Sequence, residues 1–286
     1  MRFDGKTALV TGAASGIGRA TALALARAGA DLAVCDLNEA ELEETAAAIR
    51  SLGRRALARR VDVARAEEVR AFADAVHAEH EAVDVLINNA GVGLGGGFLD
   101  TSLEDWQWIL SINLWGVIHG CHFFLPRMVR RGRGGHVVNV SSAAGFLATP
   151  QLAAYSATKF AVFGLSEALR EELRPHGIAV TTVCPGIINT PITTSAPMRG
   201  PLATPEARAA LVEIYRRRNY GPERVAANIL RAIARRRAVA PISPEAWVMY
   251  LMKRLSPGLT ARLNRALQAR MERQMGLSAA PPRAQA

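Results

Sequence analysis

Residues 136 to 159 read HVVNVSSAAGFLATPQLAAYSATK. An apolar strand pattern ends at Ser141 and Ser142, and a loop of small residues then leads to Tyr155 and Lys159 in the pattern Y-x-x-x-K. Residues four apart share one face of a helix, so the phenol and the ammonium should lie about one turn apart. The lysine charge favours the phenolate, so a phenol that ordinarily titrates near ~10 could work closer to neutrality. The stretch predicts a general acid/base for an alcohol or a ketone, with the Ser142 hydroxyl beside it.

A glycine-rich turn near the start of the chain gives that pair a context. The apolar run KTALVT, residues 6 to 11, predicts a buried strand, and TGAASGIG, residues 11 to 18, leads from it into a helix that ends near Gly29. Glycines let a backbone approach a pyrophosphate, and a helix N-terminus offers free N–H groups. The spacing G-x-x-x-G-x-G differs from the usual dinucleotide pattern G-x-G-x-x-G, and an ordinary tight turn is the alternative. We expect a phosphate cradle.

An acidic residue ends the second predicted strand. The strand DLAVC, residues 31 to 35, is followed by Asp36 about twenty positions after the glycine turn, which suits a hydrogen bond to an adenosine ribose. Leu37 stands where a basic residue could have held a 2′-phosphate. A carboxylate repels that phosphate, so NAD is favoured over NADP. Arg19 could weaken this preference, but we expect it to face solvent.

Strand and helix patterns alternate along the rest of the chain to residue 242. One strand runs into Asn88, Asn89, Ala90 and Gly91, and small residues at a strand's carboxyl end suit the ligand crevice of an open α/β sheet. The predicted helices cover residues 39–52, 65–81, 102–131, 153–175 and 222–236, and the further predicted strands cover 56–61, 83–87, 136–140, 178–184 and 239–242.

Two segments are expected to border a pocket. GVGLGGGF, residues 91 to 98, is read as a flexible lining of the substrate entrance, and residues 187 to 221, rich in proline and threonine before turning helical, as a mobile lid. The helix 102–131 is expected to break near Asn113, a polar residue within SINLWGV. A buried asparagine with satisfied hydrogen bonds is the alternative reading of that residue.

Composition bounds the class of protein. The 286 residues are 50% hydrophobic, enough for one large α/β domain or two small ones. No apolar run approaches ~18 residues, so no membrane-spanning helix is expected. The start lacks a signal-peptide core, and three scattered cysteines, Cys35, Cys121 and Cys184, read as reduced core thiols of a cytosolic protein. His119, Cys121 and His122 cannot all share one helix face, so no metal site is expected.

Positive charge is concentrated at the end of the chain. The net charge is +10, and residues 216 to 286 carry 15 Lys and Arg against 3 Glu. Such a region could meet nucleic acid or anionic lipid, but without a motif a solvated basic face is favoured and no nucleic-acid partner is expected.

The segment 244–276 reads as an amphipathic basic helical extension, followed by a disordered tail at 277–286. Within it the stretch 246–255 is strongly apolar, and five apolar residues then recur at i+4 with arginines between them, namely Leu259, Leu263, Leu267, Met271 and Met275. The extension could pack on the body, extend the lid, pair with another subunit or lie on a membrane surface. Packing of the apolar stripe on the protein is the favoured prediction.

With these motifs in hand, the chain resembles the classical short-chain dehydrogenase/reductase family over about residues 4 to 242. TGAASGIG is similar to the family's cofactor turn, NNAG (88 to 91) to its central-strand motif and YSATK (155 to 159) to its active-site motif. The resemblance implies a doubly wound, Rossmann-type α/β domain at 1–243 with a mostly parallel seven-stranded sheet and helices on both faces. It also implies a cytoplasmic homodimer or homotetramer.

The resemblance implies site residues as well. Ser142 is preferred over Ser141 because its interval to Tyr155 matches the family. The implied catalytic set is Asn113, Ser142, Tyr155 and Lys159. The implied cofactor set is Gly12, Ser15, Gly16, Ile17, Gly18, Asp36, Asp62, Val63, Asn89, Ala90, Gly91, Tyr155, Lys159, Pro185, Gly186, Ile188 and Thr190, with Asp62 and Val63 at the adenine and Thr190 at the nicotinamide carboxamide.

The expected reaction is hydride transfer between NAD(H) and a secondary alcohol or ketone. Tyr155 would exchange the proton, Ser142 would bind the substrate oxygen, Lys159 would stabilise the phenolate and bind the nicotinamide ribose, and Asn113 would hold a relay water. Apolar residues at the pocket edge favour a lipophilic, steroid-like or lipid-like substrate: Leu94, Phe146, Leu147, Leu152, Ile187 and Ile188. The alternatives are an NADPH-dependent ketoreductase, or a cofactor-binding regulator without turnover.

Overall fold

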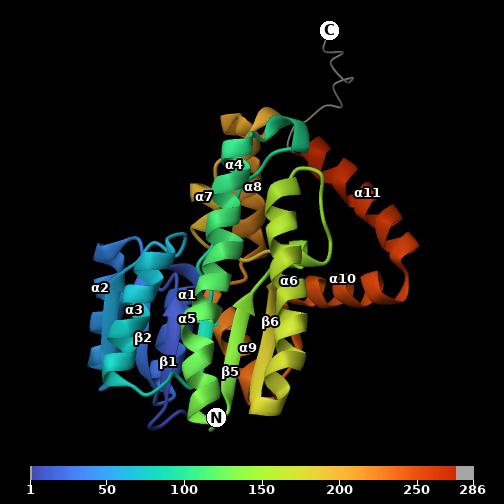
Figure 1. Ribbon diagram of the computed structural model, residues 1–286. Helices are drawn as coiled ribbons and strands as arrows, with labels where there is room; N and C mark the ends of the chain where they lie inside the picture. The colour runs from blue at the N-terminus through green and yellow to red at the C-terminus, as the bar shows by residue number, and fades with distance from the viewer. Residues whose placement is uncertain (1, 275–286) are drawn as a thin grey trace.

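A single seven-stranded sheet organises the molecule (Figure 1). The computed structural model describes residues 2–274. The strands run in the order β3-β2-β1-β4-β5-β6-β7, and every neighbouring pair is parallel. Their bounds are β1 Thr7–Thr11, β2 Asp31–Asp36, β3 Ala56–Arg60, β4 Val85–Asn88, β5 Gly135–Val140, β6 Ile178–Pro185 and β7 Val239–Ile242. The doubly wound sheet predicted from the sequence is confirmed.

Helices follow the strands and cover both faces of the sheet. The α-helices are α1 Gly16–Arg27, α2 Glu39–Ser51, α3 Ala66–Glu79, α4 Leu103–Leu110, α5 Gly116–Arg131, α6 Ala153–Leu173, α7 Ile192–Ser195, α8 Pro205–Arg218, α9 Pro222–Ala234, α10 Pro244–Leu255 and α11 Pro257–Gln274. Short helical turns are η1 Phe98–Asp100, η2 Ser111–Trp115, η3 Ala143–Gly145, η4 Arg174–His176 and η5 Gly200–Ala203.

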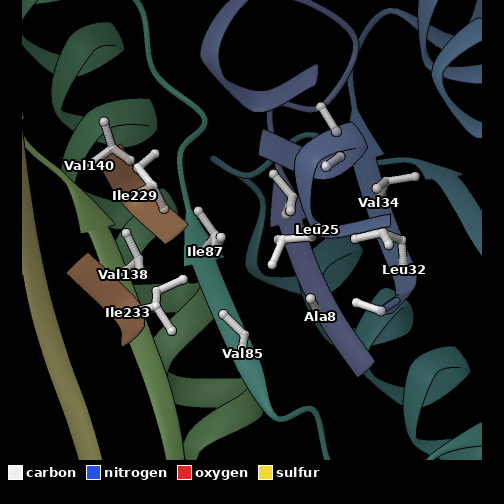
Figure 2. Close-up of a cluster of buried hydrophobic side chains, with 14 of the residues drawn as sticks. Ala8, Leu25, Leu32, Val34, Val85, Ile87, Val138, Val140, Ile229 and Ile233 are labelled. Carbon is white, nitrogen blue, oxygen red and sulfur yellow. The ribbon is translucent and has the colours of Figure 1, made fainter. Parts of the chain in front are cut away.

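Two apolar clusters, one on each face, form the core. Successive strand residues point to opposite faces, so Val10 joins the cluster beneath α1, α2 and α9 while Leu9 joins the cluster beneath α3, α5 and α6. Figure 2 shows the first cluster, where Leu25 of α1 and Ile229 of α9 approach Ile87 of β4 and its neighbours. Because both faces are covered, the strands other than the edge strand β3 are buried almost throughout, as their continuous apolar runs predict.

The strand order reverses between β1 and β4. The chain builds β2 and β3 on one side of β1, then crosses back to place β4, β5, β6 and β7 on the other side. Loops leaving the carboxyl ends of β1 and β4 therefore diverge, and such a switch point is where open α/β sheets commonly bind their ligands. The fold brings the glycine turn after β1 and the NNAG motif after β4 to this one place.

Among the described residues, Leu103–Arg131 is the one helical stretch that is both long and apolar enough to cross a membrane. By length and composition alone it could cross a membrane, whereas the sequence reading expected no such helix. A π-helical turn, η2, divides it at Asn113, where the predicted break falls. The α5 side chains Val117, Phe124 and Met128 are buried in the second core cluster, so this face is part of the fold's interior.

The C-terminal extension forms two helices joined at Ser256. A polar row on α11 faces the protein: Thr260 is buried, and the Asn264 amide donates to the Ala148 carbonyl at 3.0 Å. Leu259 and Leu263 are 52% and 42% exposed, so they do not pack on the body of this chain, and packing of the stripe against a neighbouring subunit stays a prediction. The side chains of Leu267 and Met271, residue Met275 and the tail 277–286 lie outside the described residues.

The three cysteines are buried free thiols, as predicted. Burial raises the pKa of Cys121 to about 12, despite a hydrogen bond from Asn88 that lowers it, so this group is an inert core thiol.

Candidate active site

The glycine turn is built around close backbone approaches. Gly12 has φ of 67°, and a Cβ there would lie 2.8 Å from the Cα of Ala90. A Cβ on Gly18 would collide with the Gly12 carbonyl oxygen. The Asn89 amide also donates to the carbonyls of Thr11 and Gly12, at 2.9 and 3.1 Å. The turn and the NNAG motif therefore form one packed unit.

The start of α1 fits the phosphates of a dinucleotide. Ser15 caps the helix without a side-chain hydrogen bond, and the first turn carries no acidic residue. A Cβ on Gly16, whose φ is 52°, would lie 3.5 Å from the Thr190 side chain, so the turn faces the segment that follows β6. Free N–H groups at a positive helix end, next to glycines that keep side chains away, suit a pyrophosphate.

Asp36 ends β2 beside this turn. Its carboxylate accepts from the Ala14 N–H at 2.9 Å and from the Asn38 N–H at 3.0 Å. The Asp36 carbonyl accepts from Val61 at 3.0 Å, so Asp36 and the Asp62–Val63 step lie at the same sheet edge. Leu37 is exposed and adds no positive charge. The arrangement fits a ribose hydroxyl at the Asp36 carboxylate.

Ser142, Tyr155 and Lys159 meet at the carboxyl end of β5. Ser142 follows the strand and caps η3, accepting from the Ala144 N–H at 3.1 Å, and its hydroxyl also hydrogen-bonds Tyr155. The Lys159 Nζ lies 5.7 Å from the centre of the Tyr155 ring and donates to the Val140 carbonyl at 3.1 Å. Ser141 instead donates its hydroxyl to the Lys159 carbonyl at 2.7 Å.

Burial dominates the electrostatics of this group. It raises the pKa of Tyr155 to about 12, and the hydrogen bond with Ser142 offsets only part of the rise. Burial also lowers the pKa of Lys159 to about 8. The expectation that the lysine charge brings the phenol towards neutrality is therefore wrong for the protein alone, because desolvation penalises both charged forms.

Asn113 is buried in the π-helical turn and uses its amide to hold neighbouring segments. Its Oδ1 accepts from the Val92 N–H at 2.8 Å, and its Nδ2 donates to the Val92 carbonyl at 2.9 Å and to the Thr158 hydroxyl at 3.2 Å. A Cβ on Gly91 would lie 3.1 Å from the Asn113 Oδ1 and 3.3 Å from the Lys159 Nζ. Asn113 thus contacts both α6, the helix that carries Tyr155 and Lys159, and the end of the NNAG segment.

The segment that follows β6 lies against the glycine turn. Pro185 ends the strand, and the Gly186 N–H donates to the Ile242 carbonyl at 3.0 Å. Thr190 faces Gly16, as described above. Ile188, however, is buried in the core cluster that contains Val10, so the expectation that it lines the substrate pocket is wrong.

A family model described as short chain dehydrogenase matches residues 6–199, which contain the glycine turn, NNAG, Asn113 and the serine-tyrosine-lysine group. The chain belongs to the short-chain dehydrogenase family. This is a family of oxidoreductases.

Known relatives agree with this assignment. The chain is 43% identical over 261 residues to "Probable oxidoreductase EphD" of Mycobacterium tuberculosis; the match covers 89% of this chain but 44% of EphD, so the chain spans less than half of that relative. It is 37% identical to SadH of Mycobacterium tuberculosis, named an oxidoreductase, over 91% of this chain and 94% of SadH. A crystal structure of a family member from Burkholderia phymatum in complex with NAD is 33% identical and superposes with a TM-score of 0.81, over 91% of this chain and 96% of that one.

In this short-chain dehydrogenase the expected flexible loop is paired on both sides. Gly95 bridges to Met198 of the lid, and Gly96 bridges to Leu152. A Cβ on Gly95 would collide with the Met198 sulfur, and one on Gly93 would lie 3.0 Å from the Ala196 Cβ. Because these positions are glycines, the lid can lie directly against the backbone of the loop 91–98. The composition of the loop did not predict this role.

Sequence reasoning missed two further residues of the lid region. Arg199 forms a two-pronged ion pair with Asp105 of α4, at 2.8 and 2.7 Å, which ties the lid to the helix that leads to Asn113. Tyr215 of α8 lies close enough to Tyr155 to raise the pKa of the Tyr155 phenol slightly further. Neither partner could be found from spacing, since 94 residues separate Arg199 from Asp105.

The histidines of α5 have separate neighbours. His119 pairs through Nδ1 with the Val63 carbonyl at 2.9 Å, whereas His122 stacks edge-on with Phe123. Within residues 2–274, no group of three His, Cys, Asp or Glu side chains gathers in a way that could hold a metal ion.

Proposed function

We propose that the chain is an NAD-dependent oxidoreductase that moves a hydride between NAD(H) and a secondary alcohol or ketone. The observation that carries the proposal is the meeting of Ser142, Tyr155 and Lys159 at the end of β5, beside a glycine turn that fits a dinucleotide. The bound nicotinamide would supply the hydride acceptor or donor. The protein would supply the proton, the orientation and the exclusion of water.

Tyr155 is proposed as the general acid/base. In ketone reduction the neutral phenol gives its proton to the substrate oxygen, and in alcohol oxidation the phenolate takes it back. The Ser142 hydroxyl, which already hydrogen-bonds the phenol, would hold the same oxygen in place. Lys159, at 5.7 Å from the ring centre, would stabilise the phenolate once it forms and bind the nicotinamide ribose.

Asn113 is proposed as a positioning residue. Both N–H groups of its amide are used, on the Val92 carbonyl and the Thr158 hydroxyl, so it could only accept a hydrogen bond from a relay water. Its main contribution would be to fix the NNAG segment and α6 relative to each other, so that the tyrosine and lysine keep their geometry.

NAD is the proposed cofactor. Asp36 keeps a carboxylate at the end of β2, and two backbone N–H groups orient it. A 2′-phosphate brought to this edge would meet that negative charge, with the aliphatic Leu37 next to it. Specificity between two ligands can rest on such a repulsion. The other residues of the implied cofactor set, which run from Gly12 to Thr190, would hold the rest of the cofactor.

A lipophilic substrate fits the surroundings of the phenol. Tyr155 belongs to an apolar cluster with Leu94, Ile109 and Ala154, and the lid opposite is built on Met198 and Leu202. Phe146, in the loop after Ser142, stacks on Tyr250 of α10 at 5.4 Å. Such walls favour an alcohol or ketone on an apolar skeleton over a polyol.

Self-association belongs to the same proposal. Trp115 is exposed at the junction of η2 and α5, on the long apolar stretch Leu103–Arg131. A homodimer or homotetramer would cover it. Sedimentation of the purified chain gives its mass in solution directly.

The test of the function is a panel of secondary alcohols and ketones, offered with NAD(H) and with NADP(H), while nicotinamide absorbance is followed. Turnover of apolar members with NAD(H) is the expected result. Cofactor binding without turnover of any member would instead indicate a regulator, and faster turnover with NADPH would indicate a ketoreductase of the other cofactor class.

A further inference from the structure

The two C-terminal helices form an arm that leaves apolar residues in water. On the outer side of α10, Val248, Leu251 and Leu255 are 55%, 49% and 83% exposed. Their spacing of three and four places them on one helix face, opposite Ala246, which is fully buried against the body. We call these three residues the outer stripe. The exposed residues Leu259 and Leu263 extend the apolar surface along α11.

The arm is held to the body through other side chains. Tyr250 stacks on Phe146, and Arg237 lies over the Trp247 ring at 5.7 Å. On α11 the contact is polar, through Thr260 and Asn264. Figure 1 shows both helices standing on the side of the molecule away from α2 and α3. The arm therefore docks by one set of residues and presents another outward.

The exposed charged side chains described on the arm have one sign. Lys253, Arg262 and Arg265 are exposed and have no carboxylate within ion-pair distance among the described residues, while Arg254 makes one long contact of 3.7 Å with Glu167. The single described acidic side chain of α10, Glu245, faces inward and pairs with Arg218 at 2.7 Å. The exposed side chains described on the arm are thus apolar or cationic.

The combination of exposed apolar and cationic side chains favours some binding partners for the arm over others. A second copy of the chain, meeting the arm across a two-fold axis, would bring the same cations against one another. An anionic bilayer surface accepts both features, because its acyl boundary takes the leucines and its headgroups attract the arginines and the lysine. We infer that the arm formed by α10 and α11 lies on the surface of anionic membranes, without spanning them.

The arm also contacts the loop that connects Ser142 to Tyr155. Phe146 and Ala148, which the arm contacts, belong to the loop between Ser142 and Tyr155. An enzyme seated on a bilayer through this arm would keep that loop close to the membrane surface, where lipophilic alcohols and ketones are concentrated. Membrane binding itself needs neither substrate nor cofactor, so its failure and a failure of the proposed function are separate results.

The test is co-sedimentation of the purified full chain with vesicles. Vesicles made of equal parts phosphatidylcholine and phosphatidylglycerol should bind the chain, and pure phosphatidylcholine should bind it about tenfold or more weakly, since each cation near an anionic surface adds to the attraction. The double variants Leu251→Ser/Leu255→Ser and Arg262→Glu/Arg265→Glu should each weaken binding to the mixed vesicles by about tenfold or more.

Matched controls change the same chemistry elsewhere. Arg27→Glu/Arg235→Glu alters as much charge on exposed positions of the body, and Leu37→Ser/Leu52→Ser replaces two leucines of the body that are 49% and 40% exposed. Both should bind like the parent, and melting curves should show that every variant is folded. Binding lost equally in arm and body variants would overturn the inference, as would no binding to mixed vesicles. A parent oligomer that the leucine variant splits, with no vesicle binding, would assign the stripe to a second copy instead.

Discussion

The Lys159 Nζ lies 5.7 Å from the centre of the Tyr155 ring and donates its hydrogen bond to the Val140 carbonyl, not to the phenol. The lysine is almost fully buried, and no carboxylate of the described chain forms an ion pair with it. Its ammonium is therefore held ready beside the tyrosine at a cost in folding free energy. Stability lost at an active site in this way is a common trade for function.

That cost predicts a stabilised but inactive variant. The pKa of Lys159 is lowered to about 8, so at neutral pH the unfolded chain binds this proton more readily than the folded one. Lys159→Met should raise the free energy of unfolding at neutral pH by roughly 1–3 kcal/mol, less than the full pKa shift because the Val140 bond is lost. The gain should shrink as pH rises from about 8 towards the ordinary lysine pKa. Chemical denaturation at several pH values measures it, and a variant less stable than the parent at neutral pH would contradict this account.

The two reaction directions should depend on pH in opposite ways. The Tyr155 phenol, with its pKa raised to about 12, is protonated across the neutral range, so it can donate to a ketone but must be deprotonated to oxidise an alcohol. The kcat/KM of oxidation should climb with pH without a plateau near neutrality. The kcat/KM of reduction should be flat there and fall above about 8, where Lys159 loses its charge. Initial rates in both directions provide the comparison, and a shared optimum near neutrality would count against it.

Cofactor preference should reverse when Asp36 is replaced. Asp36→Ala with Leu37→Arg removes the repulsion of a 2′-phosphate and adds a cation beside it, so the ratio of NADP to NAD affinity should rise at least about a hundredfold. Leu37→Arg alone is the matched control and should shift the ratio less, because the carboxylate stays. Calorimetric binding of both cofactors gives the ratios. A parent that already binds NADP more tightly would show the role given to Asp36 to be wrong.

Asn113 should matter for the fold before it matters for chemistry. Asn113→Ala leaves the Val92 N–H and carbonyl without their partner in a partly buried place, so the free energy of unfolding should fall by roughly 1–3 kcal/mol. Asn113→Asp keeps the acceptor for the Val92 N–H but loses both donors, and it should be intermediate only where the carboxyl is protonated, at acid pH. Equal stability of the alanine variant and the parent would remove the proposed positioning role.

Local patterns predicted the sheet and most of the site. Most strands are short apolar runs with their ends marked by glycine, proline or a polar residue, and β1 with its turn shows how directly such a run specifies a buried strand before a helix. The cofactor and catalytic motifs lie at strand ends, where the topology brings them together. Once the order of the strands is known, the motifs are therefore expected to lie close together.

Features that depend on long-range packing were not predictable in this way. The sign of the Tyr155 pKa shift rests on how completely the site is buried, which Y-x-x-x-K does not contain. The Arg199–Asp105 pair joins distant segments. On α11, periodicity identified an apolar stripe, but which stripe faces the body was decided by the polar contacts of Thr260 and Asn264 with their surroundings.

The central claim, that Tyr155 carries the proton, is tested most directly by Tyr155→Phe. The ring and its apolar cluster remain, and only the hydroxyl is lost, so the fold and the cofactor cradle should be unchanged. We predict turnover of any alcohol or ketone at less than about a hundredth of the parent rate, with NAD affinity within about twofold, because general acid/base catalysis contributes at least that factor. A variant that binds NAD normally and keeps more than about a tenth of the parent turnover would contradict the account.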